Sequence, residues 1–328
     1  MSDVTALVLS IGEDYTERAL ASVRRQTYLA AETIVVRGIS PFYRALNAGA
    51  ARVRTEFFIQ VDADMILDDN CIEDLRSCMS EGVGIAVGHL RDPLLGQIVG
   101  IKLFRTRCFD RVTLRESTSP ETNFVQDIQR LGWTTVYALK YSGESPAELH
   151  LFGEHRPDYT PHYTFCKYMR EGAKARYRKA GDGFRSVFRQ LRSSAHESAT
   201  IATIAAAHGI FVQEERDLYG PFEQSQGFEF LERFLNAPQT GGSAPAVQGE
   251  FVHKDFREGF KRSYELGILL RQCRSSAAFM AYMRQLGKER SIASWVALVG
   301  LCHGLFFEEY REAEAEEAFA LLRHLLPV

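Results

Sequence analysis

The stretch that decides the fold is Phe57-Phe-Ile-Gln-Val-Asp-Ala-Asp-Met-Ile-Leu67, in which an apolar run leads directly into Asp62 and Asp64. A short apolar run bounded by polar residues is typical of a strand that is buried on both faces of a parallel sheet. Two carboxylates at the end of such a strand can bind one divalent cation, and hard oxygen ligands suit Mg²⁺ or Mn²⁺. An Asp-x-Asp pattern also fits a solvated strand end. The surrounding sequence therefore has to distinguish a cation site from such an end.

The segments around this stretch alternate between strand and helix patterns. Strand patterns lie at residues 6–10, 33–36, 56–61 and 83–87, and helical spacing lies at 15–26, 42–52 and 69–79. This alternation predicts an α/β fold with right-handed crossovers and a mostly parallel sheet flanked by helices. Ligands of such sheets bind beyond the carboxyl ends of the strands, which is where Asp62 and Asp64 stand.

After about residue 180 the patterns favour helix almost throughout. The helical segments are 184–192, 198–212, 227–235, 251–272, 276–286 and 293–326. Residues 236–249 have the Gly, Pro and Ser content of a flexible connection. The sequence therefore predicts an α/β domain over residues 1–180 and an α-helical domain over residues 181–328.

Composition excludes several classes of protein. Of the 328 residues 45% are hydrophobic and 25% are charged, with a formal net charge of -3, which argues against a disordered chain and against a nucleic-acid binder. The six cysteines form no CxxC pattern, which favours idle thiols in a reducing compartment. The N-terminus does not resemble a signal peptide, and the apolar run 292–307 is shorter than the ~20 residues of a membrane helix. We expect a cytoplasmic protein; peripheral contact with the inner face of the membrane and homo-oligomerisation stay open.

Two helical segments and the Asp62-Ala-Asp64 strand end form an ordered set. Residues 18–27, RALASVRRQT, match the pattern "l-x-S-l-x-x-Q-t", and residues 45–55, ALNAGAARVRT, match "a-x-N-x-G-x-x-x-a-x-G". In this order and spacing they resemble the family 2 glycosyltransferases, which have the GT-A fold. The resemblance covers roughly residues 5–178. It implies a hexosyltransferase-type enzyme with a DXD motif, Asp62 and Asp64, that holds Mn²⁺ or Mg²⁺ on a nucleotide-sugar and inverts the anomeric centre.

Two later segments resemble further elements of that family. Residues 121–133, ETNFVQDIQRLGW, look like the acceptor-side segment, which implies that Asp127 is the general base, with Glu121 as the alternative base or as an acceptor-positioning residue. Residues 153–157, GEHRP, look like the late "H-x-R" element. It implies that His155 completes the metal shell or touches the diphosphate, with His150 as its competitor. An imidazole ligand would modestly favour Mn²⁺.

The second strand departs from the family pattern. It ends in Val36-Arg37-Gly38 instead of the Asp-Asp-Gly-Ser element whose first acid helps to hold the nucleotide base. The donor-binding candidates are Ser10, Glu13, Arg37, Asn47 and Asp62, with Asp14 as an alternative to Glu13; Asp62 is thus a candidate for both the metal and the donor. We expect a UDP-sugar as the donor and a glycan or lipid-linked molecule as the acceptor.

Two other function classes stay open beside surface glycan or glycoconjugate synthesis. A sugar nucleotidyltransferase would need a Gly-rich phosphate loop after the first strand, which Ser10-Ile-Gly-Glu13 lacks. A non-catalytic GT-A-like binding module would explain the missing base-binding acid.

Residues 156–192 carry ten Lys or Arg against three acids. This basic segment fits a solvated face, a contact with the diphosphate, or a contact with an anionic glycan or a lipid headgroup.

Overall fold

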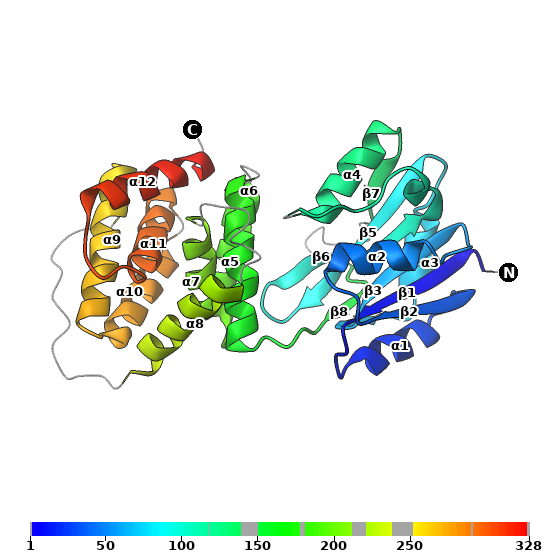
Figure 1. Cartoon of the computed structure of the whole chain (residues 1–328), viewed down its shortest axis with the longest axis horizontal. Helices are drawn as coiled ribbons and strands as arrows, with labels where there is room; N and C mark the ends of the chain where they lie inside the picture. The colour runs from blue at the N-terminus through cyan, green and yellow to red at the C-terminus, as the bar shows by residue number, and fades with distance from the viewer. Residues whose placement is uncertain are drawn as a thin grey trace. The chain divides into compact units, whose positions relative to one another are not determined.

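The computed structural model describes residues 2–117, 119–138, 150–177, 181–211, 221–237, 252–289 and 291–326. Its contacts divide the chain into two compact units, Met1–Pro157 and Asp158–Val328. The first unit is α/β, and the described part of the second is helical (Figure 1). This division comes before helix α5 (Pro161–Tyr177). The sequence predicts the domain boundary at residue 180, after α5, and that boundary stays a prediction.

The first unit is built on one mixed sheet. Its described strands are β1 (Val4–Ser10), β2 (Glu32–Arg37), β3 (Phe57–Asp62), β4 (Met65–Leu67), β5 (Val83–Asp92), β6 (Gly96–Arg105), β7 (Thr134–Tyr137) and β8 (Gly153–His155). They lie in the order β2-β1-β3-β6-β5-β8-β4, and β7 pairs with β5. Strand β1 is parallel to β2 and β3, whereas β6 is antiparallel to both β3 and β5.

Helices cover both faces of this sheet. They are α1 (Thr16–Arg24), α2 (Phe42–Ala50), α3 (Cys71–Ser77) and α4 (Pro120–Arg130), and a 3-10 turn spans Thr106–Asp110. The side chains of β1 alternate between two buried apolar clusters, because successive residues of a strand point to opposite faces. Val4, Ala6 and Val8 pack with α1 and α3, while Leu7 and Leu9 pack with α2 and α4. The predicted α/β class, with helices on both faces, is confirmed.

The hairpin of β5 and β6 was not expected from the sequence pattern, which indicated a strand only over residues 83–87. The chain reverses at Asp92-Pro93-Leu94-Leu95-Gly96. There the Asp92 carboxylate accepts the backbone N–H of Leu94 at 2.9 Å and of Leu95 at 2.7 Å. An aspartate that binds its own following backbone is a turn-forming device. The hairpin contributes antiparallel pairing to the sheet, as do the pairs β3–β6 and β4–β8.

The motif residues of α1 and α2 have structural roles. The buried Gln26 donates from Nε2 to the carbonyl of Asp68 at 2.8 Å and accepts the N–H of Ile72 at 2.9 Å. It therefore ties the end of α1 to the segment after β4 and to the first turn of α3. A Cβ on Gly49 would lie 2.4 Å from Cδ1 of Leu7, so a larger side chain would force either Leu7 or α2 to shift.

The second unit contains most of the predicted helices. After α5 come α6 (Gly181–Ser193), α7 (Ala199–Gly209), α8 (Pro221–Asn236), α9 (Phe256–Gln272), α10 (Ser276–Lys288), α11 (Ile292–Gly304) and α12 (Glu312–Leu322), with a short 3-10 turn at Arg323–Leu325. Residues 238–249 of the predicted flexible connection lie outside the described residues. No described helix combines the length and the apolar character that crossing a bilayer requires.

The long helix predicted over residues 293–326 is wrong, because the chain breaks it into α11 and α12. Glu312 and Glu314 stand in the first turn of α12, and acidic side chains stabilise a helix N-terminus. They thus favour a new helix start at this point. The run of glutamates at 308, 309, 312, 314, 316 and 317 indicates, from the sequence, a solvent-exposed acidic face. Part of it is paired with α9, since Glu316 lies 2.6 Å from Nη2 of Arg257 and Glu308 lies 3.1 Å from Nη2 of Arg271.

Candidate functional site

The carboxyl ends of β2, β1 and β3 bring three predicted residues to one edge of the sheet. Ser10 is the register partner of Arg37, and Leu9 is the register partner of Asp62. Because the three strands are parallel and adjacent, these residues follow one another along the edge where α/β sheets bind ligands. Asp62 is the last residue of β3, as the pattern around it predicts.

The Asp62 carboxyl group is held in an unfavourable electrostatic environment. Nε2 of Gln60 donates to its Oδ1 at 3.0 Å. The pKa of Asp62 is raised to about 7, by burial first, then by the negative charge of Asp64, and less by that of Glu121. The hydrogen bond from Gln60 and the positive charge of Lys102 oppose this rise. Since like charges destabilise the ionised form, a cation placed here would be stabilising.

Asp64 lies between β3 and β4 and faces a histidine from a distant part of the chain. Its Oδ2 is 3.2 Å from Nε2 of His155, while its Oδ1 is buried without a hydrogen-bond partner among the described residues. His155 arrives here because β8 pairs antiparallel with β4, with Met65 opposite His155. Gly153 permits that pairing, since a Cβ there would lie 2.2 Å from the carbonyl oxygen of Ile66.

Asp92 is a site residue that the sequence analysis missed. It is 2% exposed, and its Oδ2 lies 2.7 Å from Nδ1 of His155. A carboxylate on one ring nitrogen fixes the orientation of an imidazole and directs the other nitrogen, which here meets Asp64. The sequence did contain a signal, because Asp-Pro-Leu-Leu-Gly at 92–96 is a turn pattern; its part in the site depends on the pairing of β8.

Glu121 stands in the first turn of α4 and belongs to the same neighbourhood. Its Oε1 lies 2.6 Å from Nζ of Lys102. Lys102 lies on β6, the strand next to β3, and its register partner is Gln60. Gln60 comes two residues before Asp62 on β3. Glu121 is also one of the charges that raise the pKa of Asp62. The structure therefore brings Glu121 to the Asp62 end of β3.

Asp127 lies elsewhere on α4. It comes six residues after Glu121, which is ~9 Å further along a helix axis. Its two carboxylate oxygens lie 2.5 Å from Nη2 of Arg115 and 2.6 Å from Nη1 of Arg130. Helix α4 leads into β7, whose first residue pairs with the first residue of β5, so α4 runs away from the carboxyl edge. The described contacts of Asp127 are thus with two arginines and not with the aspartate pair.

Two of the predicted donor-binding residues make local contacts at the same edge. Oε2 of Glu13 accepts hydrogen bonds from Oγ of Ser10 at 2.7 Å and from the N–H of Ile11 at 2.8 Å, so Glu13 closes the loop after β1. The exposed Arg37 has its Nη2 3.8 Å from Glu17. This long, solvated ion pair leaves Arg37 available to a ligand.

Two other predicted residues are directed to structural partners. Asn47 donates from Nδ2 to the carbonyl of Leu114 at 2.8 Å and accepts its N–H at 3.0 Å, so the amide clamps α2 to the chain before α4. His150, the competitor of His155, has its Nε2 3.6 Å from Asp74 on α3. The structure therefore brings His155, and not His150, to the aspartate pair.

The aspartate pair fits a hard divalent cation that shares its shell with a substrate. Among the residues described by the structure, no group of three His, Cys, Asp or Glu side chains converges on one point as a ready-made metal site. Mg²⁺ is, however, usually bound by one or two carboxylates, with water and substrate phosphates completing the shell. The buried, unpartnered oxygen of Asp64 and the mutual repulsion of the two aspartates suit such an ion.

Comparison with known proteins yields structural likeness without sequence likeness. The sequence matches no protein-family model and no curated protein. Among solved structures, the chain is similar to the mannosyltransferase PcManGT from Pyrobaculum calidifontis in complex with GDP-Man and Mn²⁺, at 11% identity over 92% of this chain and 85% of that chain, with a TM-score of 0.44.

The chain is also similar to S. aureus TarS 1–349. The TarS complex with UDP is 12% identical over 98% of this chain and 91% of that chain, with a TM-score of 0.38. The complex with UDP-GlcNAc is 13% identical over 98% and 92%, with a TM-score of 0.34. At such scores these likenesses carry no argument about the activity of this chain, which has to be derived from its own side chains.

Proposed function

We propose that the protein is a metal-dependent, inverting glycosyltransferase that moves a sugar from a nucleotide-diphosphate donor to an acceptor hydroxyl. The observation that carries this proposal is the pair Asp62 and Asp64 at the carboxyl end of β3, with one buried Asp64 oxygen that lacks a hydrogen-bond partner among the described residues. Two half-satisfied carboxylates at a ligand-binding sheet edge are arranged for a cation that is itself bound to a phosphate.

Asp62 and Asp64 hold the cation in this proposal. When bound, Mg²⁺ or Mn²⁺ supplies Lewis-acid stabilisation of the negative charge on the departing diphosphate. His155, oriented by Asp92 at 2.7 Å, fixes the Asp64 carboxylate by its contact at 3.2 Å. Holding these groups in place before the reaction avoids reorganisation as charge develops.

Glu121 is the general base in this proposal. The motif resemblance implies Asp127 as the base, and we now make Asp127 the alternative. A base must lie within hydrogen-bond reach of the attacking hydroxyl, and Glu121 lies near the aspartate pair while Asp127 is held by two arginines. The acceptor oxygen bonds to the anomeric carbon as its proton passes to Glu121, and the bond from that carbon to the diphosphate oxygen breaks.

Ser10, Glu13 and Arg37 form the donor side of the site in this proposal. Ser10 ends β1, Arg37 ends β2 and Glu13 lies in the loop after β1, all at the same edge as Asp62. The guanidinium of Arg37 is exposed and is the group best suited to a nucleotide phosphate or base. A UDP-sugar remains our first choice of donor and a glycan or lipid-linked hydroxyl our first choice of acceptor, with a hexose as the sugar transferred.

The test is a panel of UDP-, GDP- and dTDP-sugars, incubated with Mn²⁺, with Mg²⁺ and with a chelator. Metal-dependent release of a nucleoside diphosphate, with an anomerically inverted product on a hydroxyl acceptor, supports the proposal. Release of pyrophosphate from a nucleoside triphosphate and a sugar phosphate would instead identify a nucleotidyltransferase. Absence of turnover, with no heat of binding for any donor with Mn²⁺, would favour a non-catalytic module.

A further inference from the structure

The helical unit contains a cavity of about 390 Å³ between α6, α10 and α11. We propose that this cavity is a binding site for a phosphate or diphosphate group, separate from the site at the end of β3. Four cationic side chains, Arg185, Arg189, Arg192 and Lys288, contribute to its lining. A volume of this size is within the ~300–1,000 Å³ of small-molecule sites, so it accommodates a phosphorylated group together with part of the molecule that carries it.

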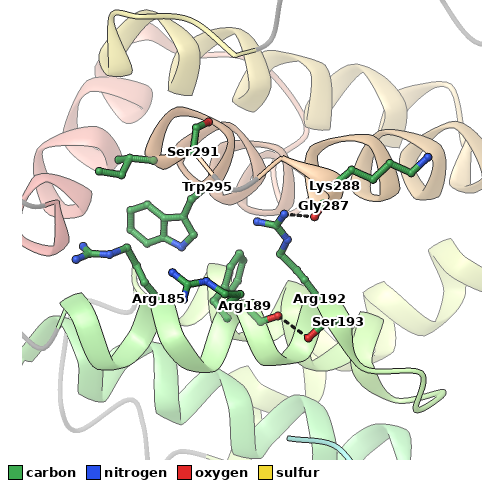
Figure 2. A pocket seen from close by; sticks show the side chains of 10 residues that line it. Arg185, Arg189, Arg192, Ser193, Gly287, Lys288, Ser291 and Trp295 are labelled. Carbon is green, nitrogen blue, oxygen red and sulfur yellow. Dashed lines mark hydrogen bonds between the residues drawn. The ribbon is translucent and has the colours of Figure 1, made fainter. Parts of the chain in front are cut away.

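Three of these cations come from one face of α6. Arg185, Arg189 and Arg192 follow the spacing i, i+4 and i+7, which places side chains on the same side of a helix. Next to this row on α6, the buried Phe184 and Phe188 anchor the helix in the core, and Phe188 also lines the cavity. Figure 2 shows Arg185 and Arg189 rising from α6 beside Trp295, and Arg192 reaching to Gly287 of the facing segment. The arginine row is thereby directed into the cavity.

Two buried N–H donors in the lining have no hydrogen-bond partner among the described residues. Nε1 of Trp295 and Nε of Arg192 are both fully enclosed and unpaired. Trp295 is only 4% exposed, and its ring is held edge-on against Phe184 at 6.3 Å between centroids. A buried donor without an acceptor is destabilising, so both groups are suited to a ligand that brings acceptor oxygens and no donors.

The cations in the lining are only partly neutralised. Arg185 is paired with Asp182 and donates to the carbonyl of Leu325 at 2.8 Å. Arg189 makes no ion pair with any residue that the structure describes. Burial and, next, the charge of Arg189 lower the pKa of Arg192, and the charge of Glu289 opposes this lowering.

Arg192 also fixes the shape of the cavity. Its Nη2 donates to the carbonyls of Leu286 at 3.0 Å, of Glu289 at 2.7 Å and of Gly287. Figure 2 shows the bond to Gly287. These carbonyls end α10, and their negative partial charges would otherwise oppose an anion. The N-terminus of α11, capped by Ser291 through the N–H of Ser294 at 3.0 Å, adds the opposite polarity. Ser291 and Ile292 both line the cavity.

Lys288 contributes charge at the margin. Its side chain is exposed, and in Figure 2 it extends away from Trp295. The groups that meet the ligand are therefore Arg189, the free Nε of Arg192 and Nε1 of Trp295. Phosphate oxygens accept from all three, and Arg binds phosphate through paired N–H groups.

The experiment uses the full chain with Trp133→Phe, which leaves Trp295 as the single tryptophan. Titration with inorganic pyrophosphate at constant ionic strength is followed by Trp295 fluorescence and by calorimetry. We expect saturable binding with a change in Trp295 emission. Arg189→Gln should weaken binding about tenfold, or ~1.4 kcal/mol, because a charged hydrogen-bond donor to the phosphate is lost. Arg284→Gln, an equal change of charge on α10 outside the lining, should leave the affinity unchanged.

Two further arms define the site and the source of the phosphate. Asp64→Asn should bind pyrophosphate as the parent does, because the proposed site is not the one at the end of β3. Vesicles that contain phosphatidylglycerol, used in place of pyrophosphate, distinguish a lipid headgroup from a soluble ligand. Binding of either probe that Arg189→Gln weakens supports the proposal. No binding of either up to about 10 mM phosphate, or binding that Arg189→Gln leaves unchanged, overturns it.

Discussion

The carboxylate edge of the first unit (Asp62, Asp64 and Glu121) and the arginine pocket of the second (Arg185, Arg189, Arg192 and Trp295) collect charge of opposite sign in different ways. The carboxylates come from the end of β3, the turn after it and the start of α4, whereas the arginines share one face of α6. Both regions leave buried polar atoms unpaired among the described residues, Oδ1 of Asp64 in one and two N–H groups in the other. Under our two proposals, the carboxylate edge takes a cation and the arginine pocket takes an anion, and this contrast can be tested by substitution.

Asp64→Asn should cause the largest loss of activity, because it removes one of the two carboxylates that hold the cation in our proposal. We expect turnover of a nucleotide-sugar to fall by about 10³-fold or more, as charge on the leaving group loses its stabilisation. The thermal midpoint should change little. Metal-dependent donor hydrolysis and a melting curve measure the two quantities. Asp110→Asn, at an exposed acid that ends the 3-10 turn Thr106–Asp110, is the matched control. Unchanged metal-dependent turnover in Asp64→Asn would refute the assignment.

Glu121→Gln should have the next largest effect, on transfer alone. Loss of a general base lowers kcat by about 10²–10⁴-fold, and the affinity for the donor should hold because Glu121 is not one of the cation ligands. Asp127→Asn provides the contrast, since it removes only the pairs with Arg115 and Arg130. Steady-state kinetics with donor and acceptor varied separately decide between the two acids. A large kcat loss in Asp127→Asn with an active Glu121→Gln would reverse our choice.

Asp62→Asn should stabilise the metal-free protein while abolishing activity. The pKa of Asp62 is raised to about 7, so between about pH 4 and 7 the folded protein keeps a proton that the unfolded chain has lost. Stability therefore falls as the pH rises through this window. At about pH 8 we expect Asp62→Asn to gain about 2 kcal/mol in the free energy of unfolding, after allowance for solvent screening. Urea unfolding measures it; no gain over the parent chain would show that the carboxylate repulsion is unimportant.

The histidine pair of the second unit should respond to pH in the opposite direction. Nδ1 of His208 and Nδ1 of His303 lie 3.1 Å apart. Burial lowers the pKa of His208 to about 4 and, with the charge of His208, holds the pKa of His303 well below its usual range. The unfolded chain then binds more protons below about pH 6.5, so stability falls as the pH drops.

From about pH 7 to 5 we expect this pair to reduce the free energy of unfolding by about 1–2 kcal/mol. His208→Phe keeps a ring on Phe306, which His208 stacks on at 3.9 Å between centroids, and should flatten the response. Urea unfolding of both proteins at the two pH values makes the comparison. An equally steep loss in His208→Phe would assign the acid sensitivity to other groups.

The sequence by itself determined the local elements and the chemistry of one strand end. The apolar run into Asp62 and Asp64, and the alternation of strands with helices before it, predicted the parallel strands β1 to β3 and the edge where their carboxyl ends meet. The basic character of residues 156–192 was also visible. These features depend on neighbours in the chain, because side-chain periodicity and strand ends are local properties.

Only the tertiary structure decided how distant residues meet. The pairing of β4 with β8 selected His155 over His150, and the β5–β6 hairpin supplied Asp92 beneath it. The direction of α4 separated Glu121 from Asp127, and the packing of α6 on α11 placed Trp295 against the arginine row. Contacts between residues so far apart in sequence follow from which strand edges and helix faces bury each other. No local pattern encodes that choice, because it is made by the free energy of the whole folded unit.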